Sequence, residues 1–280
     1  MRRWAWIPAA AVAGAGALAA LALLPHRAPP RAAAPVPSLA APVLPPRLEG
    51  RGPERAELRF LLRLGLPVRC GGRRSRDVAL TFDDGPGPYT ALALRILRRA
   101  HLHATFFLVG KELPYRPWAP RAELRVGALG DHTWTHRFLP ALPLATVREE
   151  LAATRDAIER ATGTPVELFR PPYGASDARI ARVAASLGMV EVLWSVDTRD
   201  SEGATWSEIV ATVAREARGG SIVLLHENRG QTIRALRFGI VPLLRRRGLV
   251  AVTVPQLLAL DPPSIAELEA GPAGCYGPGR

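Results

Sequence analysis

Two histidines four positions apart follow a pair of adjacent carboxylates in this sequence. The histidines are His132 and His136, and the carboxylates are Asp83 and Asp84. A histidine pair at this spacing is more often incidental, but in a helical or tight turn both imidazoles can face one ion. One carboxylate of the aspartate pair would complete a two-histidine, one-carboxylate set with positions open for water and substrate. The pattern predicts a divalent metal site, for which zinc fits well and cobalt, nickel or iron remain alternatives.

The neighbouring carboxylates suggest a division of labour. Side chains of adjacent residues point in different directions, so one can bind the metal while the other takes a proton from a water whose pKa the metal lowers. His226 can supply a proton to a leaving group. Metal, base and acid together are the chemistry of a hydrolase.

Short apolar runs alternate with amphipathic helical patterns along the chain, which indicates an α/β fold with a parallel sheet, either open or closed into a barrel. The expected strands are Val78–Phe82, Ala104–Val109, Leu124–Leu129 (the weakest), Val166–Phe169, Val190–Val196, Ser221–Leu225 and Leu249–Val254. The expected helices are Ala91–His101, Leu144–Thr162, Asp177–Leu187, Trp206–Arg218 and Thr232–Arg247.

Four of these strands run directly into ionisable residues. Asp83 and Asp84 follow the first, and Arg170, Asp197 and His226 follow three others. Parallel strands place such residues on one rim, which is the catalytic face of α/β barrels. A single polar residue at a strand end is often just a solvated loop residue, but four strand ends together predict an active site.

The N-terminal region predicts export. Residues 1–25 combine a basic start with an uncharged run, Trp4–Pro25, that suits either a cleaved signal peptide or a membrane anchor. Residues 26–54 form a Pro/Ala-rich linker, 55–262 the catalytic domain and 263–280 a Gly/Pro-rich tail. We expect the protein to lie at the extracellular face of the cell, either secreted or anchored.

The chain carries a formal net charge of +12, and Lys111 is its only lysine. The excess of arginine, with abundant alanine, proline and glycine, is typical of a compositional bias, so the charge does not predict nucleic-acid binding. It does favour anionic partners such as a charged cell envelope. We expect a monomer.

Cys70 and Cys275 flank the region that contains all the motifs. In an oxidising compartment they could form a disulfide that ties the ends of the domain together. The alternative is two free thiols.

Five ordered motifs resemble those of the polysaccharide deacetylases, also called the NodB-homology or carbohydrate esterase family 4 domain. The motifs are Thr81-Phe82-Asp83-Asp84-Gly85-Pro86, His132-Thr133-Trp134-Thr135-His136, Arg170-Pro171-Pro172-Tyr173-Gly174, Asp197-Thr198-Arg199-Asp200 and Leu224-Leu225-His226. The resemblance covers about residues 76–260 and implies a distorted (β/α) barrel, usually with seven parallel strands.

The resemblance also implies roles for individual residues. Asp84, His132 and His136 would bind the metal, Asp83 would be the general base and His226 the general acid. Arg170 would orient the base, and Asp197 would be the carboxylate near the general acid. The backbone N–H of Tyr173 would help to hold the oxyanion, and Leu224 would line the pocket for the acetyl methyl group.

The implied activity is metal-dependent removal of acetyl groups from N-acetylated sugars of an extracellular polysaccharide, with peptidoglycan N-acetylglucosamine as the first choice. Alternatives are a non-catalytic glycan-binding barrel at the cell surface and an O-acetyl esterase of the xylan type. One departure from the family is Ser201, which follows Asp200 where a tryptophan is common. Trp206 lies close in sequence and could replace its packing.

Overall fold

The computed structural model describes residues 52–276. The predicted hydrophobic segment and most of the predicted linker lie outside these residues. Among the described helices, none is both long and apolar enough to cross a bilayer.

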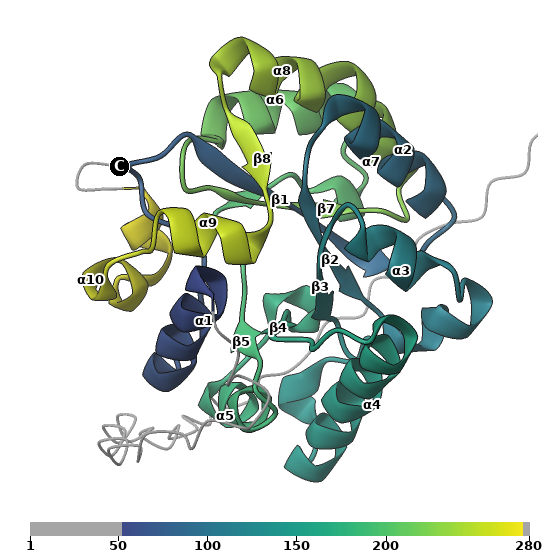
Figure 1. Ribbon diagram of the computed structural model, residues 1–280, viewed down its shortest axis with the longest axis vertical. Coiled ribbons are helices and arrows are strands. Elements are labelled where there is room, and N and C mark those ends of the chain that lie inside the picture. The colour runs from purple at the N-terminus through teal and green to yellow at the C-terminus, as the bar shows by residue number, and fades with distance from the viewer. Residues whose placement is uncertain (1–51, 277–280) are drawn as a thin grey trace, which may run out of the picture. The chain divides into compact units, whose positions relative to one another are not determined.

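A curled parallel sheet forms the centre of the domain (Figure 1). Its strands are β1 (Asp77–Gly85), β2 (Ala104–Leu108), β3 (Gly127–Asp131), β4 (Leu168–Phe169), β5 (Val190–Glu191), β6 (Val196–Asp197), β7 (Ile222–His226) and β8 (Val250–Val252). Seven strands follow the order β5-β4-β3-β2-β1-β7-β6. Strand β8 pairs with the first residues of β1, Asp77 to Ala79, before the residues that pair with β2. The predicted distorted barrel of seven parallel strands is confirmed.

Helices surround this sheet (Figure 1). They are α1 (Pro53–Leu64), α2 (Thr90–Ala100), α3 (Ala119–Leu124), α4 (Leu144–Thr162), α5 (Ala178–Ser186), α6 (Trp206–Glu216), α7 (Gly230–Ala235), α8 (Val241–Arg247), α9 (Val254–Leu260) and α10 (Ile265–Glu269). Short 3₁₀ turns are η2 (Gly110–Tyr115), η3 (Leu139–Ala141), η4 (Pro172–Gly174), η5 (Asp200–Glu202) and η7 (Gly271–Cys275), and a π turn, η6 (Leu236–Ile240), joins α7 to α8.

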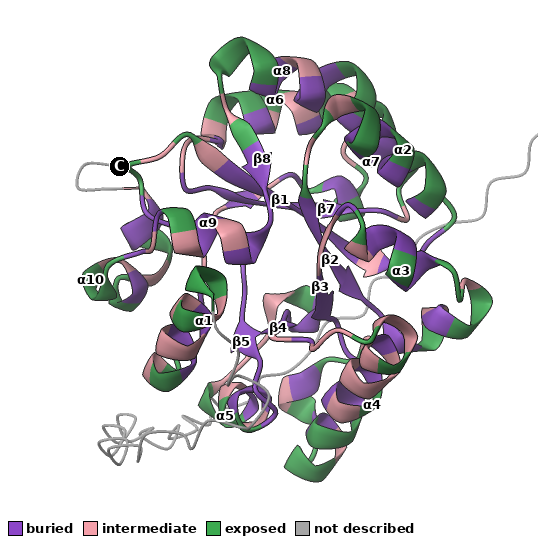
Figure 2. Cartoon of the chain, in the orientation of Figure 1, coloured by how far each residue is buried: buried purple, intermediate pink, exposed green. Residues whose placement is uncertain are grey.

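The two faces of β1 show how the sequence positions the site. Successive side chains of a strand point to opposite faces. Val78, Leu80 and Phe82 belong to the apolar layer between the sheet and its outer helices, whereas Ala79 belongs to the barrel interior with residues of α1 and α9. Buried residues accordingly run along the strands and the inner sides of the helices (Figure 2). The interior face of β1 continues through Thr81 to Asp83, which lies near the carboxyl end of the strand.

The gap between the two sides of the sheet is bridged by the segment that precedes β1. Val68 pairs with Val192 after β5, and Cys70 pairs with Ser221 at the start of β7. The backbone N–H of Leu193 donates to the carbonyl of Val68 at 2.7 Å. This segment fixes the chain between β5 and β6.

Two strand predictions need correction. The run expected as one strand, Val190–Val196, contains two short strands, because β5 pairs with β4 and β6 pairs with β7. The weak strand expected at Leu124–Leu129 is shifted: Leu124 ends α3, and the strand runs from Gly127 to Asp131. Its glycines allow close packing, since a Cβ on Gly127 would lie 1.7 Å from the carbonyl oxygen of Ala104.

The predicted disulfide joins Cys70 to Cys275, 205 positions apart. The segment expected as a tail continues the domain through α10 and η7 as far as Tyr276. The Tyr276 hydroxyl donates to the carbonyl of Ser195, and the Arg218 guanidinium lies 4.6 Å from the Tyr276 ring. The C-terminal end is therefore attached beside the bridge that joins β5 to β6.

We predict that removing this disulfide destabilises the domain. A C70S/C275S variant should lose about 2–5 kcal/mol of unfolding free energy, because the unfolded chain regains the freedom of a very long loop. Guanidinium denaturation of the variant and of the oxidised and reduced wild type would measure the change. Equal midpoints for all three would contradict the prediction.

Candidate active site and metal centre

The end of β1 presents two adjacent carboxylates to one site. Alternation alone would send Asp83 and Asp84 to opposite faces. The pairing of β1 with β2 slips between Phe82 and Gly85, and Asp84 adopts a left-handed conformation with φ of 66°. This irregularity turns the Asp84 carboxylate towards the same histidines that Asp83 faces. His132 Nε2 lies 3.8 Å from Asp83 Oδ2 and 3.7 Å from Asp84 Oδ1.

The two histidines lie in the loop after β3, on either side of a bend and not in a helix. The His132 N–H donates to the carbonyl of Leu108, which extends the strand pairing into the loop. The backbone N–H and hydroxyl of Thr135 donate to the Glu150 carboxylate at 2.7 and 2.6 Å. His136 has φ of 61°, and its Nε2 lies 3.2 Å from Asp84 Oδ1.

The Asp84, His132 and His136 side chains suit a metal ion. One ligand atom from each lies within 4.8 Å of the other two. His132 Nδ1 is 2.7 Å from the Arg170 carbonyl oxygen, which can only accept, so Nδ1 carries the proton and Nε2 keeps its lone pair.

Electrostatics favour the ligand forms of two of these side chains. Burial lowers the pKa of His132 and favours the neutral imidazole. Burial raises the pKa of Asp84, but the hydrogen bond with His136 and the nearby histidines outweigh it and hold that pKa well below its usual range. The donor set fits a divalent cation and does not choose among zinc, cobalt and nickel.

Arg170 pairs with Asp83 in the barrel interior. Its side chain is fully buried, and its Nη1 donates to Asp83 Oδ1 at 2.8 Å and to Thr81 Oγ1 at 2.7 Å. The remaining donors reach the Val192 and Leu193 carbonyls at 3.1 and 2.9 Å. These bonds fix the orientation of the Asp83 carboxylate.

His226 pairs in register with Asp83 across β7 and β1. Neighbouring paired residues lie on the same face of a sheet. His226 Nδ1 donates to Asp200 Oδ1 at 2.7 Å, and its backbone N–H donates to Asp200 Oδ2 at the same distance. The second imidazole nitrogen, Nε2, is left for other contacts.

The carboxylate beside His226 is therefore Asp200, and the prediction for Asp197 is corrected. Asp197 ends β6, lines the site cavity, and accepts a hydrogen bond from the Arg199 N–H at 2.9 Å. Asp200 is buried in the turn that follows and also accepts from the Thr232 hydroxyl. Both aspartates stand in the same sequence motif, and only the path of this turn decides which one reaches His226.

The pKa of His226 is raised. Burial lowers it, but the hydrogen bond to Asp200 and the charges of Asp200, Asp83 and Asp84 outweigh the burial. The imidazole therefore stays protonated to a higher pH than an ordinary histidine does, which suits a proton donor.

A cavity of about 520 Å³ contains these groups. Tyr173, Leu224, Trp194 and Ser201 also line it. Tyr173 has φ of 62°, is 68% exposed, and packs edge-on against the His136 ring. Trp206 packs in the layer of outer helices and does not line this cavity, so it does not replace a tryptophan at position 201.

A second hollow of about 310 Å³ shares Asp84 and His136 with the first. Asp84 and His136 therefore border both hollows. Asn228 lines the second hollow, and its Nδ2 donates to Asp84 Oδ2 at 3.3 Å. From the sequence, Asn228 lies just beyond His226, where a side chain could reach substrate, but no ligand pattern gives it a role. Glu150 lies within α4, and the sequence gives no sign of its contact with Thr135.

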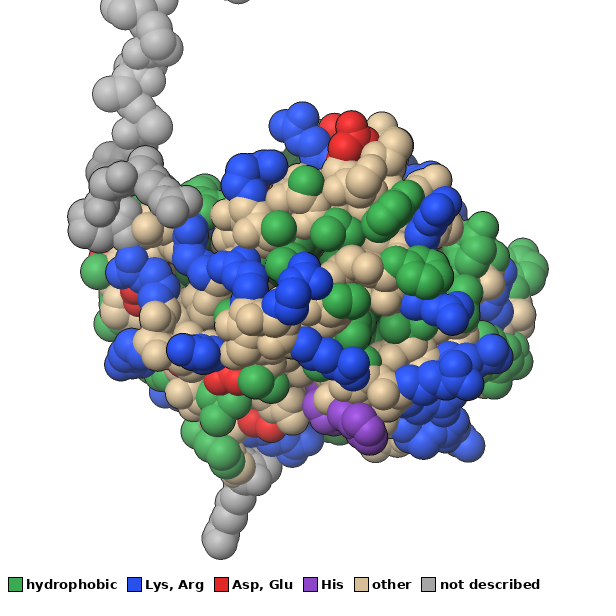
Figure 3. Space-filling model, turned by 90° about the horizontal axis from the view of Figure 1, so that it is seen from above, with side chains coloured by type: hydrophobic (Ala, Val, Ile, Leu, Met, Phe, Trp, Pro, Cys, Tyr) green, Lys and Arg blue, Asp and Glu red, His purple; other side chains and the backbone are tan. Residues whose placement is uncertain are grey.

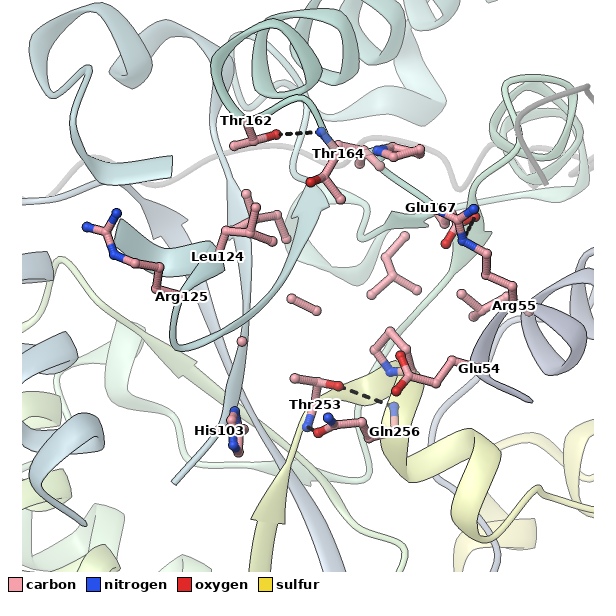
Figure 4. Close-up of a pocket in the computed structure, with 18 residues that line it drawn as sticks. Glu54, Arg55, His103, Leu124, Arg125, Thr162, Thr164, Glu167, Thr253 and Gln256 are labelled. Carbon is pink, nitrogen blue, oxygen red and sulfur yellow. Dashed lines mark hydrogen bonds and ion pairs between the residues drawn. The ribbon is translucent and has the colours of Figure 1, made fainter. Parts of the chain in front are cut away.

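Another cavity, of about 400 Å³, lies at the opposite ends of the strands (Figure 4). Its lining includes His103 before β2, Gly127 at the start of β3 and Glu54 at the start of α1. His103 Nδ1 lies 3.0 Å from the Val126 carbonyl oxygen. None of the residues predicted for the site lies in this cavity.

Comparison with known proteins identifies the family to which this chain is similar. The family model "Polysaccharide deacetylase" matches residues 71–192. A peptidoglycan-N-acetylglucosamine deacetylase of Bacillus cereus is 35% identical over 188 residues, which cover 65% of this chain and 87% of the relative. A bifunctional xylanase/xylan deacetylase of Cellvibrio japonicus is 32% identical over 180 residues, 64% of this chain but only 27% of the relative.

The solved structures similar to this chain include a carbohydrate esterase family 4 pseudoenzyme from Bacillus anthracis, with a TM-score of 0.65 and 28% sequence identity. The match covers 69% of this chain and 68% of that one. This chain belongs to the polysaccharide deacetylase family.

We predict that substitution of a proposed metal ligand lowers the affinity for zinc, whereas substitution of the proposed base does not. H132A should lower zinc affinity at least tenfold, because one of three protein ligands is lost. D83N should retain zinc, since its amide oxygen can still accept from Arg170. Calorimetric titration of the metal-free protein would measure both affinities. Equal losses in the two variants would contradict the assignment of ligands.

Proposed function

We propose that this protein is a metal-dependent hydrolase that removes acetyl groups from N-acetylated sugars of an extracellular polysaccharide. The observation that carries the proposal is the placement of Asp83 and His226. They occupy paired positions on adjacent strands beside Asp84, His132 and His136. A carboxylate and an imidazole with raised pKa beside a metal ligand set suit base and acid roles in amide hydrolysis.

The proposed reaction divides the work among these residues. A divalent metal, held by Asp84, His132 and His136, would polarise the acetyl carbonyl and lower the pKa of water. Asp83, oriented by Arg170, takes a proton from the attacking water. His226 gives a proton to the sugar nitrogen, and acetate leaves. Asp200 keeps His226 oriented and protonated.

Two further residues are proposed to bind the acetyl group. Leu224 lies two positions before His226 and therefore on the same face of β7. Its side chain would contact the acetyl methyl group. The backbone N–H of Tyr173 would donate to the developing oxyanion, as a fixed donor in such a site should.

Peptidoglycan N-acetylglucosamine is the proposed substrate. It is the substrate named for the Bacillus cereus relative, which this chain matches over most of that relative's length. The predicted export would place the enzyme at the wall. A secreted or anchored location and the use of zinc belong to the same proposal.

Two alternatives remain from other classes. The pseudoenzyme neighbour shows that a member of this family can lack catalysis, as the glycan-binding alternative requires. In this chain, however, each position expected for metal, base and acid is occupied by a suitable residue. The xylan deacetylase relative supports an O-acetyl esterase on the same site. An ester would release acetate without needing a proton on nitrogen.

Acetate release distinguishes these alternatives. We expect the purified protein to release acetate from peptidoglycan, to lose the activity with a chelator and to regain it with zinc. D83N should reduce kcat at least a hundredfold, in line with the loss of a general base. Binding without acetate release would favour the silent barrel, and release from acetylated xylan alone would favour the esterase.

The raised pKa of His226 predicts the alkaline side of the pH profile. A raised pKa keeps the acid protonated as pH increases, so activity falls only when pH exceeds that value. D200N removes the carboxylate that raises it, and the alkaline limb of kcat/KM should move to lower pH. Profiles of wild type and D200N, each checked by thermal melting, would measure the shift. An unchanged alkaline limb would contradict the role of Asp200.

A further inference from the structure

A groove on the outer helical surface is lined by four arginines. It lies between α2 and the run from α7 to α8, and its volume is about 250 Å³. Arg95 and Arg99 come from α2, and Arg237 and Arg245 come from η6 and α8. Leu92, Ile96, Ala100 and Val241 supply an apolar lining. We call this region, together with Phe238, the arginine face.

Among residues 52–276, no carboxylate neutralises these arginines. All four side chains are exposed, and none forms an ion pair with a carboxylate among residues 52–276. The stretches 85–111 and 228–260, which form α2, α7 and α8, contain no aspartate and no glutamate. On the neighbouring helix α6, Glu208 bonds to Thr205 and Glu216 pairs with Arg215. The groove therefore presents uncompensated positive charge.

The arginine-rich composition of the chain does not explain this arrangement. Helix α4 carries Arg148, Arg155 and Arg160, but it also carries Glu149, Glu150, Asp156 and Glu159. Helix α1 likewise mixes both signs. Acidic residues are missing from the two long stretches that border the groove, in contrast to the mixed charges of α1 and α4. This contrast indicates an anionic partner.

Exposed apolar side chains lie among these arginines. Phe238 is 59% exposed and lies 5.0 Å from the Arg237 guanidinium, and Leu92 is 37% exposed. Basic and hydrophobic side chains are intermixed over this side of the molecule, with few acidic ones (Figure 3). A soluble polyanion would gain little from Phe238 and Leu92. A lipid surface provides anionic headgroups for the arginines and an apolar boundary for these two side chains.

We propose that the arginine face docks the domain on a membrane surface rich in anionic phospholipid. The guanidinium groups of Arg95, Arg99, Arg237 and Arg245 bind headgroup phosphates, for which arginine offers a planar fork of donors. Phe238 and Leu92 enter the boundary between headgroups and acyl chains. The active-site cavity shares no residue with the groove, so a docked domain keeps that cavity open to substrate.

Vesicle binding tests the proposal with the full chain. Vesicles of phosphatidylcholine alone would measure any contribution of the segment Trp4–Pro25. Vesicles that also contain phosphatidylglycerol would measure the charge-dependent part. We expect the wild type to bind the anionic vesicles more tightly than the neutral ones. In R95Q/R99Q/R237Q/R245Q this gain in affinity should be at least tenfold smaller, since each arginine near an anionic surface contributes to binding. Added salt should reduce the gain in the wild type.

A matched variant controls for net charge. R63Q/R125Q/R160Q/R182Q removes the same charge from exposed arginines on or beside α1, α3, α4 and α5. It should retain most of the gain, and thermal melting would confirm that both variants fold. Equal losses in the two fourfold variants, or no gain for the wild type on anionic vesicles, would overturn the proposal.

A further arm separates lipid from a soluble polyanion. F238S should weaken binding to anionic vesicles several-fold and leave the affinity for soluble polyphosphate unchanged, because only the lipid surface has an apolar layer. If polyphosphate binds the groove and anionic vesicles do not, the face is a site for a soluble polyanion and the membrane proposal is wrong.

Discussion

The ion pair between Arg170 and Asp83 organises the interior of the barrel. A buried charge costs several kcal/mol of desolvation unless its partners are well placed. Here the guanidinium finds acceptors at Thr81, Asp83, Val192 and Leu193, and it stacks 4.1 Å from the Phe107 ring. The carbonyl of the same arginine accepts from His132 Nδ1. Arg170 therefore orients both the proposed base and a proposed metal ligand, and a change at this position would disturb both.

Unusual backbone conformations gather around this pair. Asp84, Thr133, His136 and Tyr173 all have positive φ, which non-glycine residues seldom adopt. Such conformations persist only where surrounding bonds impose them, and they concentrate at functional sites. The Glu150 carboxylate, bound by Thr135, and the hydroxyl of Thr133, which accepts from the His136 N–H, hold the histidine loop. The geometry of the proposed metal ligands thus depends on residues outside the ligand set.

The proposed reaction, the choice of sugar and the location of the protein depend on different parts of this domain. The proposed reaction depends on the arrangement of Asp83, Asp84, His132, His136 and His226. The family alone does not specify the substrate, because relatives in it are named for different substrates. The proposed substrate sugar would occupy the two hollows beside Asp84 and His136. Ser201 and Trp194 line one hollow, and Asn228 lines the other. The arginine face concerns location, because it lies on helices outside the cavity.

The sequence alone predicted the fold class, the grouping of Asp84, His132 and His136, and the proposed base and acid, and it offered the Cys70–Cys275 disulfide as one of two alternatives. Strand alternation and strand ends carry that information, since they fix which residues share a face and a rim. Only the tertiary structure decided that Asp200, and not Asp197, contacts His226, because the path of a turn has no regular sequence repeat like the two-residue alternation of a strand. It also split Val190–Val196 into two strands, since each half pairs with a different neighbour, and it brought together the distant arginines of α2 and α8.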